Sequence, residues 1–495
     1  MRLISRYRAR FIALAGNALS GDSLKSSVFR GGAWLGTGMF AEQAARFGRN
    51  MLLARLLAPA AFGTMAIALS ATSIIQTMAD LGVRDAVIQN PRGAEAEYVN
   101  ASWWISMGRA LLLAVALCLL SPWIANFYGN PELGPLFRVC ALGLLLSGST
   151  SPGLSVAIKQ MKFRKVAIVT HGGGLCGVVF TVCLSFYIRD VWALAIGYAG
   201  ESAACSILSF VLCPFRPRLK WCGAAARDLT SFSKRMIGLS LLNLIFARTD
   251  IFVLGKLRTA AELGLYTMAV NLVQTPTSFA MNLLGRTILP ALSHVQDNVA
   301  RMNRVLLTVM SLLMAVGIPA LVFVLFCGRP LLTLVYGHRY STAAGPFVVA
   351  TAVALVNLLN GQITSVFSAI GRPNLHRWCV AIMAGVMLFL IYPMIAHFGV
   401  VGGQLAALVA VVVGFLFQAM RVHEITGLDL SQHRGVLIRA IAVSVCVPAA
   451  CLGLRWLSVS RQPLGSVVIG ASGCLVAYSI TAFLLVRQRP WTTVE

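Results

Sequence analysis

Apolar stretches long enough to cross a lipid bilayer recur along this chain from about Gly31 to about Leu485, and no soluble domain separates them. A hydrocarbon core about 30 Å thick requires roughly 20 helical residues, and backbone polar groups in lipid must be satisfied within their own segment. Composition agrees, because 58% of residues are hydrophobic and 12% are charged, too little polar surface for a water-soluble globule of 495 residues. The chain is therefore predicted to be an all-α integral membrane protein.

Hydropathy predicts about 14 transmembrane helices. Their approximate ranges are 31–54, 63–86, 102–126, 136–157, 165–187, 190–213, 236–256, 264–288, 304–327, 345–369, 375–397, 399–420, 436–456 and 464–486. A closed β-barrel would instead need strands of about ten residues with alternating polarity, which Leu405–Phe417 does not show. Helices are therefore preferred throughout.

The basic residues that give the chain its net charge of +25 fall mainly in alternate loops between the predicted spans. With the N-terminus inside, about 28 of the 41 Lys and Arg residues fall on the cytoplasmic side, about nine outside and about four within spans. The inner set includes Arg2, Arg6, Arg8, Arg10, Lys159, Lys162, Arg164, Lys165, Arg216, Arg218, Lys220, Arg227, Lys234 and Arg235. This asymmetry predicts two cytoplasmic termini. It also excludes the continuous basic face of a nucleic-acid-binding protein, so no nucleic-acid partner is expected.

Residues 1–30 are predicted to form an amphipathic arm on the cytoplasmic surface, because the apolar run Phe11–Ala15 is too short for a cleaved signal peptide. The 12 cysteines lie mostly within predicted spans and form no CxxC pair. His171 with Cys176, and His376 with Cys379, lack the further ligands that a metal needs. We therefore expect no metal, no disulfide and no cofactor.

The second half of the chain repeats the first. Arg55–Gly63 and a following Thr-Met-Ala match Lys256–Gly264, which is followed by Thr-Met-Ala after two extra residues; Tyr128–Gly129 matches Tyr336–Gly337 at a similar offset of about 200 residues. That offset covers six spans, and an even number keeps both copies in the same orientation. Such repeats facing each other across a cavity are a transporter design, although a duplication retained only for packing is the alternative.

The predicted domains follow from this repeat. They are a cytoplasmic arm (1–30), an N-terminal six-helix lobe (31–214), a basic linker (215–235), a C-terminal six-helix lobe (236–424), and two additional helices with a short cytoplasmic tail (425–495).

Several charged side chains lie within the predicted spans, where a charge costs at least about 2.5–3.5 kcal/mol unless it faces a partner or water. The deep arginines are Arg46, Arg49, Arg109 and Arg248, and the deep acids are Glu42, Glu201 and Asp250. The excess of arginine favours a cavity that binds an anionic substrate, since a guanidinium can hold a phosphate through two hydrogen bonds. The acids are candidates for ion coupling; alternatively Glu42/Arg46 and Arg248/Asp250 are structural pairs.

Four further charged residues lie toward the inner ends of spans 2 and 8 and are candidates for an inner gate, although snorkelling to the interface explains them equally well. They are Asp80, Arg84, Asp85 and Arg286. The sequence contains no GxxxxGK[ST] phosphate loop, so the chain is expected to be a transporter rather than a nucleotide hydrolase.

Two regions carry a family resemblance. The stretches Asp250–Lys256, Leu263–Tyr266, Pro276, Pro290–Ser293 and Gln296–Asp297 resemble the seventh-to-eighth-span signature of the bacterial polysaccharide flippases, a branch of the multidrug/oligosaccharidyl-lipid/polysaccharide exporter (MOP) superfamily. In the first half, Phe62–Ala66, Asp80–Gly82 and Ala86–Gln89 resemble the second span of the same family.

The resemblance implies two six-helix lobes plus two helices in the bacterial inner membrane. It implies movement of undecaprenyl-diphosphate-linked repeat units from the cytoplasmic to the periplasmic leaflet for exopolysaccharide, capsule or O-antigen assembly, with H+ or Na+ coupling proposed for such proteins. Arg46, Arg49 and Arg248 match the family's cationic cavity by position. A polysaccharide polymerase and export complex would be its protein partners.

Three alternatives stay open at this point. One is a cation-coupled drug exporter or peptidoglycan-precursor flippase of the same superfamily. The others are a membrane-embedded glycan polymerase or ligase, which the short outer loops of roughly ten residues disfavour, and a scaffold without transport of its own.

Overall fold

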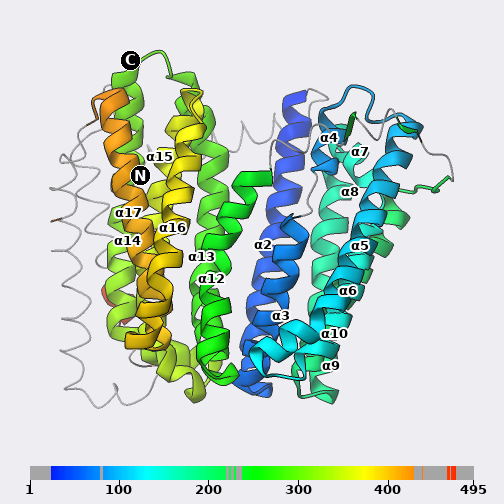
Figure 1. Ribbon diagram of the computed structural model, residues 1–495. Helices are drawn as coiled ribbons and strands as arrows, with labels where there is room; N and C mark the ends of the chain where they lie inside the picture. The colour runs from blue at the N-terminus through cyan, green and yellow to red at the C-terminus, as the bar shows by residue number, and fades with distance from the viewer. Residues whose placement is uncertain are drawn as a thin grey trace. The chain divides into compact units, whose positions relative to one another are not determined.

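The computed structural model describes residues 24–78, 82–218, 222–223, 228–229, 237–428 and a few positions between 438 and 474 (Figure 1). The regular elements within these ranges are helices. The predicted arm up to residue 23, most of the predicted linker, and nearly all of the two additional helices predicted at the C-terminus lie outside the described residues.

The chain divides into two compact units. The first unit comprises residues 1–57 and 71–238, and the second comprises residues 58–70 and 239–495. The start of α3 therefore packs with the second unit although it precedes most of the first unit in sequence. The bounds of the two predicted lobes stay predictions, and each unit is described by itself below.

The first unit is built from long helices interrupted by short ones. Its elements are α2 (Leu24–Leu56), the end of α3 (Pro59–Met78), α4 (Val83–Gln89), α5 (Ala96–Tyr128), α6 (Leu133–Gly148), α7 (Gly153–Lys159), α8 (Phe163–Ala167), a π-helical turn η1 (Ile168–Gly172), α9 (Gly173–Tyr187) and α10 (Val191–Leu212). Helix α5 packs along α6, α10 packs along both α9 and α6, and α2 packs against α8 and α9.

The second unit contains the longest helices. Its elements are the start of α3, α12 (Ile237–Leu257), α13 (Ala260–His294), α14 (Val299–Tyr336), a 3-10 turn η2 (His338–Ala343), α15 (Ala344–Ala369), α16 (Asn374–Phe398) and α17 (Val400–Thr426). Helix α15 contacts α13, α14 and α17, while α16 packs along α17. A core cluster that includes the fully buried Leu306, Ile363 and Phe367 joins these helices.

The described helices confirm an all-α membrane fold. Eight spans are long and apolar enough to cross a membrane, and the bent pair α6–α7, with an angle of 51°, is a ninth if it counts as one span. Helices α2, α12 and α13 are also long, at 33, 21 and 35 residues, but are not among these spans. The chain is a multi-pass membrane protein, and the total of about 14 spans stays a prediction.

Two predicted spans differ from the observed helices. The predicted span 63–86 is wrong as a continuous helix, because α3 ends at Met78 and α4 begins only after Gly82, whose φ of 55° is left-handed. Glycine adopts this conformation without the steric cost that a Cβ adds, so the chain can turn there. The predicted end of span 8 at residue 288 is also too early, since α13 continues through Pro290 to His294.

The repeat seen in the sequence has structural counterparts. Gly129 ends α5 with φ 64°, and its counterpart Gly337 ends α14 with φ 103°. In the second unit, Gly63 of α3 and Gly264 of α13 lie so close that a Cβ on either would overlap a backbone carbonyl of the other helix. Both sequence matches between the two halves thus contain glycines whose lack of a side chain the local backbone requires.

Candidate functional site

Four polar side chains from three parts of the first unit form one hydrogen-bonded group, which we call the α2 charge cluster. Arg46 Nε donates to Glu42 Oε1 at 2.8 Å one turn earlier on α2. Arg46 Nη2 also donates to Glu201 of α10, and His171 Nδ1 of η1 lies 2.7 Å from Glu42 Oε2. One guanidinium is thus held by two carboxylates.

The α2 charge cluster is largely enclosed. The exposed fractions of the Arg46, Glu42, Glu201 and His171 side chains are 28%, 14%, 24% and 18%. Removing one member of an enclosed ion pair leaves its partner charged and poorly solvated, which costs far more than loss of a surface pair. The cluster is therefore a structural constraint on α2, α10 and η1 as well as a source of charge.

Glycines on the neighbouring helices make room for this cluster. A Cβ on Gly174 of α9 would overlap the Glu42 side chain, and a Cβ on Gly177 would overlap Glu201. On α2, a Cβ on Gly38 would lie 2.8 Å from the His171 ring. The glycine-rich start of α9 thus leaves room for both carboxylates, and the π-helical turn beside it carries His171. Single π-helical turns are frequent at functional sites.

Arg49 lies next to the cluster along α2 but has a different environment. Its Nε and Nη2 atoms donate to Asn50 Oδ1 at 3.3 and 3.2 Å, and no carboxylate among the described residues pairs with it. Its side chain is partly buried. Arg49 therefore keeps its full charge, whereas Arg46 is neutralised locally.

Arg46, one of the four arginines predicted to line an anion-binding cavity, is thus paired with two carboxylates. The alternative interpretation of Glu42 and Arg46 as a pair is correct, and Glu201, which the sequence placed only by depth, completes it. Arg109 is half-buried on α5.

In the second unit, Asp250 of α12 is 8% exposed and accepts a hydrogen bond from the Tyr266 hydroxyl of α13. The backbone N–H of Ile251 donates to Asp250 Oδ1 at 2.8 Å, and Gln404 Nε2 of α17 donates to the Tyr266 hydroxyl oxygen at 2.7 Å. We call Asp250, Tyr266 and Gln404 the Asp250 cluster. Asp250 and Arg248, which the alternative interpretation paired, form no salt bridge within the described residues.

A cavity of about 210 Å³ borders the Asp250 cluster inside the second unit. Its polar lining, besides Asp250 and Gln404, consists of Gln274, Thr277 and Asn357, and no basic residue is found among the described residues that line it. An acid beside a polar cavity can hold a proton or a small cation. No group of three or more His, Cys, Asp or Glu side chains placed to bind a metal occurs in the described part of the chain.

Two of the four inner-gate candidates have side chains within the described structure. Arg84 and Asp85 are exposed on the short helix α4, rather than at the end of a continuous span. Arg286 lies on α13, with its side chain outside the described atoms, and Asp80 lies outside the described residues.

Sequence reasoning missed three members of these clusters: His171, Tyr266 and Gln404. His171 was weighed only as a metal ligand, yet it directly precedes the three glycines Gly172, Gly173 and Gly174, and that run signals a close helix approach. Tyr266 is one of the two extra residues that distinguish the second copy of the repeat from the first. Nothing in the sequence near Gln404 marks it.

The fold and these clusters together define a helical membrane protein with charged groups inside its helix bundles, the class to which membrane transporters belong. Residues 52–345 match the sequence profile of a family described as polysaccharide biosynthesis protein, and the chain belongs to that family.

Curated relatives carry related names. The chain is 23% identical over 74% of its length to the lipopolysaccharide biosynthesis protein WzxC of Escherichia coli, covering 73% of that protein. It is 21% identical over 59% of its length to the succinoglycan biosynthesis transport protein ExoT of Rhizobium meliloti, again covering 59% of that protein.

Among solved structures, the lipid II flippase MurJ in an inward closed conformation shares the fold. The TM-score is 0.75 over 91% of this chain and 99% of that one, at 13% sequence identity. This likeness establishes the all-α transporter fold.

Proposed function

We propose that this protein is a flippase that carries undecaprenyl-diphosphate-linked oligosaccharide repeat units from the cytoplasmic to the periplasmic leaflet of the bacterial inner membrane. Family membership and the names of the curated relatives support a role in polysaccharide assembly. The fold shared with a lipid II flippase supports a lipid-linked cargo. Alternating exposure of a cationic cavity to the two sides is the proposed mechanism, with both termini in the cytoplasm.

The observation that carries this proposal is Arg49, a partly buried guanidinium within a long membrane-protein helix that pairs with no described carboxylate. A diphosphate loses many hydrogen bonds to water when it enters the protein, and a preplaced guanidinium can replace two of them at once. Asn50 holds the Arg49 side chain in position before a substrate arrives. Arg109 and Arg248 are further candidates to contact the anionic head group.

Arg46 takes a different role in this proposal. Because its Nε and one of its terminal nitrogens already donate to Glu42 and Glu201, it positions α2 against α10 rather than serving as the main phosphate ligand. The two carboxylates and the neighbouring His171 are candidates to exchange a proton during transport. The Asp250 cluster beside its cavity is a second candidate for H+ or Na+.

The test is complementation of a strain that lacks this protein, with the Arg49→Ala variant compared with the Arg92→Ala variant. Arg92 is exposed and pairs only with the nearby Glu95 among the described acids, so its replacement is a matched loss of one arginine. We expect Arg49→Ala to abolish surface polysaccharide and to accumulate the lipid-linked unit on the cytoplasmic leaflet, at normal protein level. Arg92→Ala should complement fully.

Unchanged polysaccharide with Arg49→Ala would remove this residue from the mechanism. A deletion strain with normal polysaccharide but altered drug tolerance or cell shape would overturn the proposed cargo in favour of a drug or a peptidoglycan precursor. A deletion strain in which the lipid-linked unit reaches the outer leaflet but is not polymerised would indicate a polymerase or ligase instead.

A further inference from the structure

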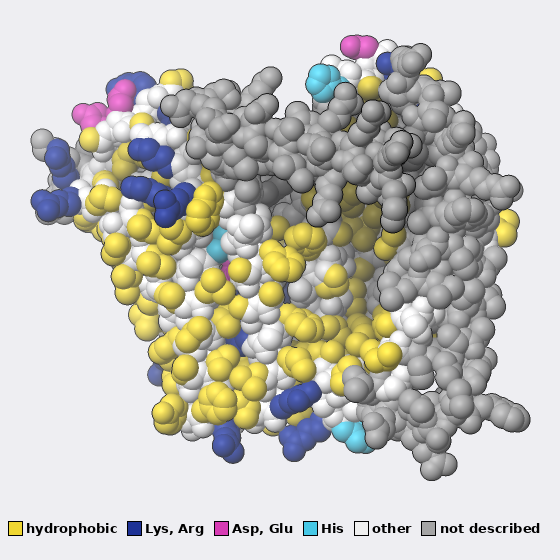
Figure 2. All heavy atoms as spheres, turned by 180° about the vertical axis from the view of Figure 1, so that it is seen from behind, with side chains coloured by type: hydrophobic (Ala, Val, Ile, Leu, Met, Phe, Trp, Pro, Cys, Tyr) yellow, Lys and Arg dark blue, Asp and Glu magenta, His cyan; other side chains and the backbone are white. Residues whose placement is uncertain are grey.

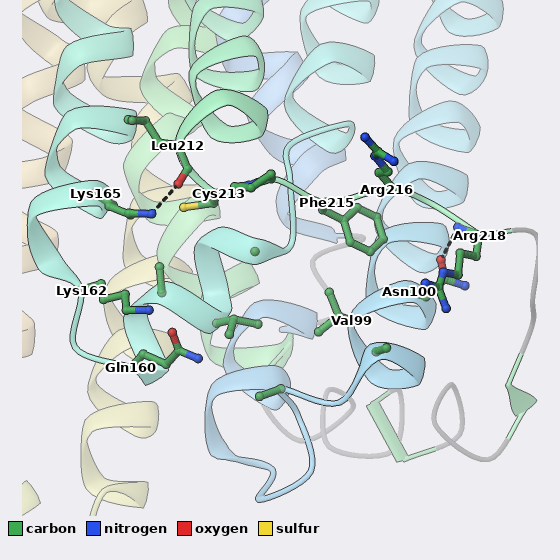
Figure 3. A pocket seen from close by; sticks show the side chains of 16 residues that line it. Val99, Asn100, Gln160, Lys162, Lys165, Leu212, Cys213, Phe215, Arg216 and Arg218 are labelled. Atoms are coloured by element: carbon green, nitrogen blue, oxygen red, sulfur yellow. Dashed lines mark hydrogen bonds between the residues drawn. The ribbon is translucent and has the colours of Figure 1, made fainter.

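A second site lies at one end of the first unit, away from the α2 charge cluster. It is a pocket of about 430 Å³ bordered by the start of α5, by α7, by the loop and helix that follow it, and by the segment after α10 (Figure 3). Four basic side chains line it: Lys162, Lys165, Arg216 and Arg218. Asn100 and Gln160 add polar groups, and none of the described lining residues is acidic.

The cations face the pocket from two sides. Figure 3 shows Gln160, Lys162 and Lys165 on one side, and Phe215, Arg216 and Arg218 on the other. Lys165 Nζ donates to the Leu212 carbonyl at 3.0 Å. The structure gives no hydrogen bond or ion pair to the side-chain donors of Lys162, Arg216 or Arg218 within the part of the chain that it describes. These three cations are therefore available to a ligand.

Hydrogen bonds fix the wall that carries the two arginines. Asn100 Oδ1 accepts from the Arg218 backbone N–H at 2.8 Å, and the Trp104 indole donates to the Arg218 carbonyl at 3.0 Å. At the other end of the segment, Ser151 Oγ donates to the Cys213 carbonyl at 2.6 Å. A pocket with its wall held in advance loses less entropy when a ligand binds than a mobile loop would.

The surroundings place this pocket at the depth of lipid head groups. It borders the first residues of the apolar helix α5 and the last residues of the apolar helix α10, and the ends of membrane-spanning helices lie near the membrane surface. Trp103 and Trp104 of α5 stack edge to face beside it, and tryptophan is enriched at the membrane interface. In Figure 2, Lys and Arg side chains gather at the upper end of the first unit, on the left, above an apolar surface.

A strained turn adds an apolar contact near this pocket. Met161 lies between the lining residues Gln160 and Lys162, and its φ of 56° is left-handed, which is rare for a residue with a Cβ. Its apolar side chain is 38% exposed. An exposed methionine beside a lysine suits a ligand that carries both an anion and a hydrocarbon chain.

We propose that this pocket binds the phosphate head group of a membrane lipid, with Lys162, Arg216 and Arg218 as its main ligands. Two lipids supply that chemistry: an anionic glycerophospholipid and a polyprenyl diphosphate. The phosphate site itself depends only on the pocket and does not depend on the proposed flippase activity. Its use as a docking point for the lipid-linked substrate before translocation rests on the proposed function.

The experiment is native mass spectrometry of the purified full-length protein in detergent, titrated separately with phosphatidylglycerol, undecaprenyl diphosphate and zwitterionic phosphatidylcholine. The Lys162→Ala/Arg216→Ala variant should bind phosphatidylglycerol, undecaprenyl diphosphate or both about thirtyfold more weakly than the unaltered protein, because each cation at a membrane surface contributes about fivefold. The Lys162→Arg/Arg216→Lys variant keeps both charges and should retain binding. Phosphatidylcholine should bind weakly to every variant.

The matched control is Arg138→Ala/Arg189→Ala, which removes two exposed arginines of the first unit that do not line the pocket. Equal affinities of the pocket and control variants for both anionic lipids would overturn the proposal, as would phosphatidylcholine binding as tight as that of the anionic lipids. Loss of undecaprenyl diphosphate alone assigns a substrate dock, and loss of phosphatidylglycerol alone assigns a bound phospholipid. If the flippase activity fails its own test while phosphatidylglycerol binding persists, the lipid site survives that failure.

Discussion

The two units place opposite charges at the same repeat position. Arg49 of α2 and Asp250 of α12 are 201 residues apart, the same offset that separates Gly63 from Gly264. In the first unit the position carries a cation that no described carboxylate neutralises, and in the second it carries a buried acid held by Tyr266. The two copies of the predicted repeat thus carry charges of opposite sign at this position.

The side chains around these two positions also differ in charge. The first unit spreads its charge over Glu42, Arg46, His171 and Glu201, with three helical segments meeting in one ion-paired group. The second unit isolates Asp250 with two neutral hydrogen-bonding side chains. This difference suits a division of labour in which one half handles an anionic substrate and the other a proton or cation.

The largest expected effect is on the stability of the first unit. Arg46→Ala leaves Glu42 and Glu201 facing each other without their cation, so we expect a loss of about 3 kcal/mol and a marked drop in folded yield. The check is fluorescence size-exclusion chromatography and thermal unfolding of the purified protein.

A charge-balanced variant separates stability from function at this cluster. Arg46→Met combined with Glu42→Gln and Glu201→Gln removes all three charges together and should recover much of the folded yield. Recovery of transport as well would show that the cluster only holds the helices together. If Arg46→Ala unfolds no more readily than the unaltered protein, the cluster is not a structural constraint.

The next effect concerns the close approach of α3 and α13. Gly63→Ala and Gly264→Ala each force a Cβ into a backbone carbonyl of the opposite helix, so we expect each to cost about 2 kcal/mol. Gly129 and Gly337 instead have no atom within 4 Å of an added Cβ, so alanine there meets backbone strain alone. Thermal unfolding of the four single variants compares the two kinds of glycine, and a silent Gly63→Ala would contradict the close contact.

The fold was largely predictable because hydropathy and repeats act over long stretches. The predicted spans 102–126, 190–213, 345–369 and 375–397 lie within or close to α5, α10, α15 and α16. The errors in the predicted spans occur where a single residue determines whether a helix ends or continues. Gly82 breaks the predicted second span through a left-handed backbone, and Pro290 does not end α13 although proline usually disfavours helix interiors.

The candidate sites were less predictable, because pairing is a tertiary property. A spacing of four placed Glu42 and Arg46 on one face, so that pair followed from the sequence. The partners Glu201 and His171 are more than a hundred residues away, and no local pattern links them to Glu42 or Arg46. The same reasoning explains why Arg248, two residues from Asp250, was a wrong partner: adjacent positions on a helix point in different directions.

A smaller loss of stability is expected when one side-chain hydrogen bond is removed from each unit. Tyr266→Phe leaves the buried Asp250 carboxylate with only the backbone N–H of Ile251 as a donor among the described residues, so we expect a loss of about 2 kcal/mol. His171→Phe leaves Glu42 still paired with Arg46, so we expect about 1 kcal/mol. Thermal unfolding of the two variants in parallel is the measurement, and an equal or reversed order would contradict the isolation of Asp250.

The smallest expected effect involves one exposed ion pair in each unit. Arg92 with Glu95 in the first unit and Arg421 with Glu424 in the second have the same three-residue spacing and similar exposure, between 45% and 61% of each side chain. Because exposed pairs gain little from pairing and are screened by salt, Arg92→Ala and Arg421→Ala should leave the thermal midpoint within about 1 °C of the unaltered protein. Each arginine also lies over an aromatic ring, Arg92 over Tyr98 at 5.2 Å and Arg421 over Phe417 at 5.5 Å, so a contribution from the ring contact should be similar at the two sites. Midpoints measured at low and high salt separate the two contributions, since salt weakens the ion pair more than the contact with the ring. A large salt-sensitive loss at either site would show that surface charge, rather than the enclosed clusters, stabilises these units.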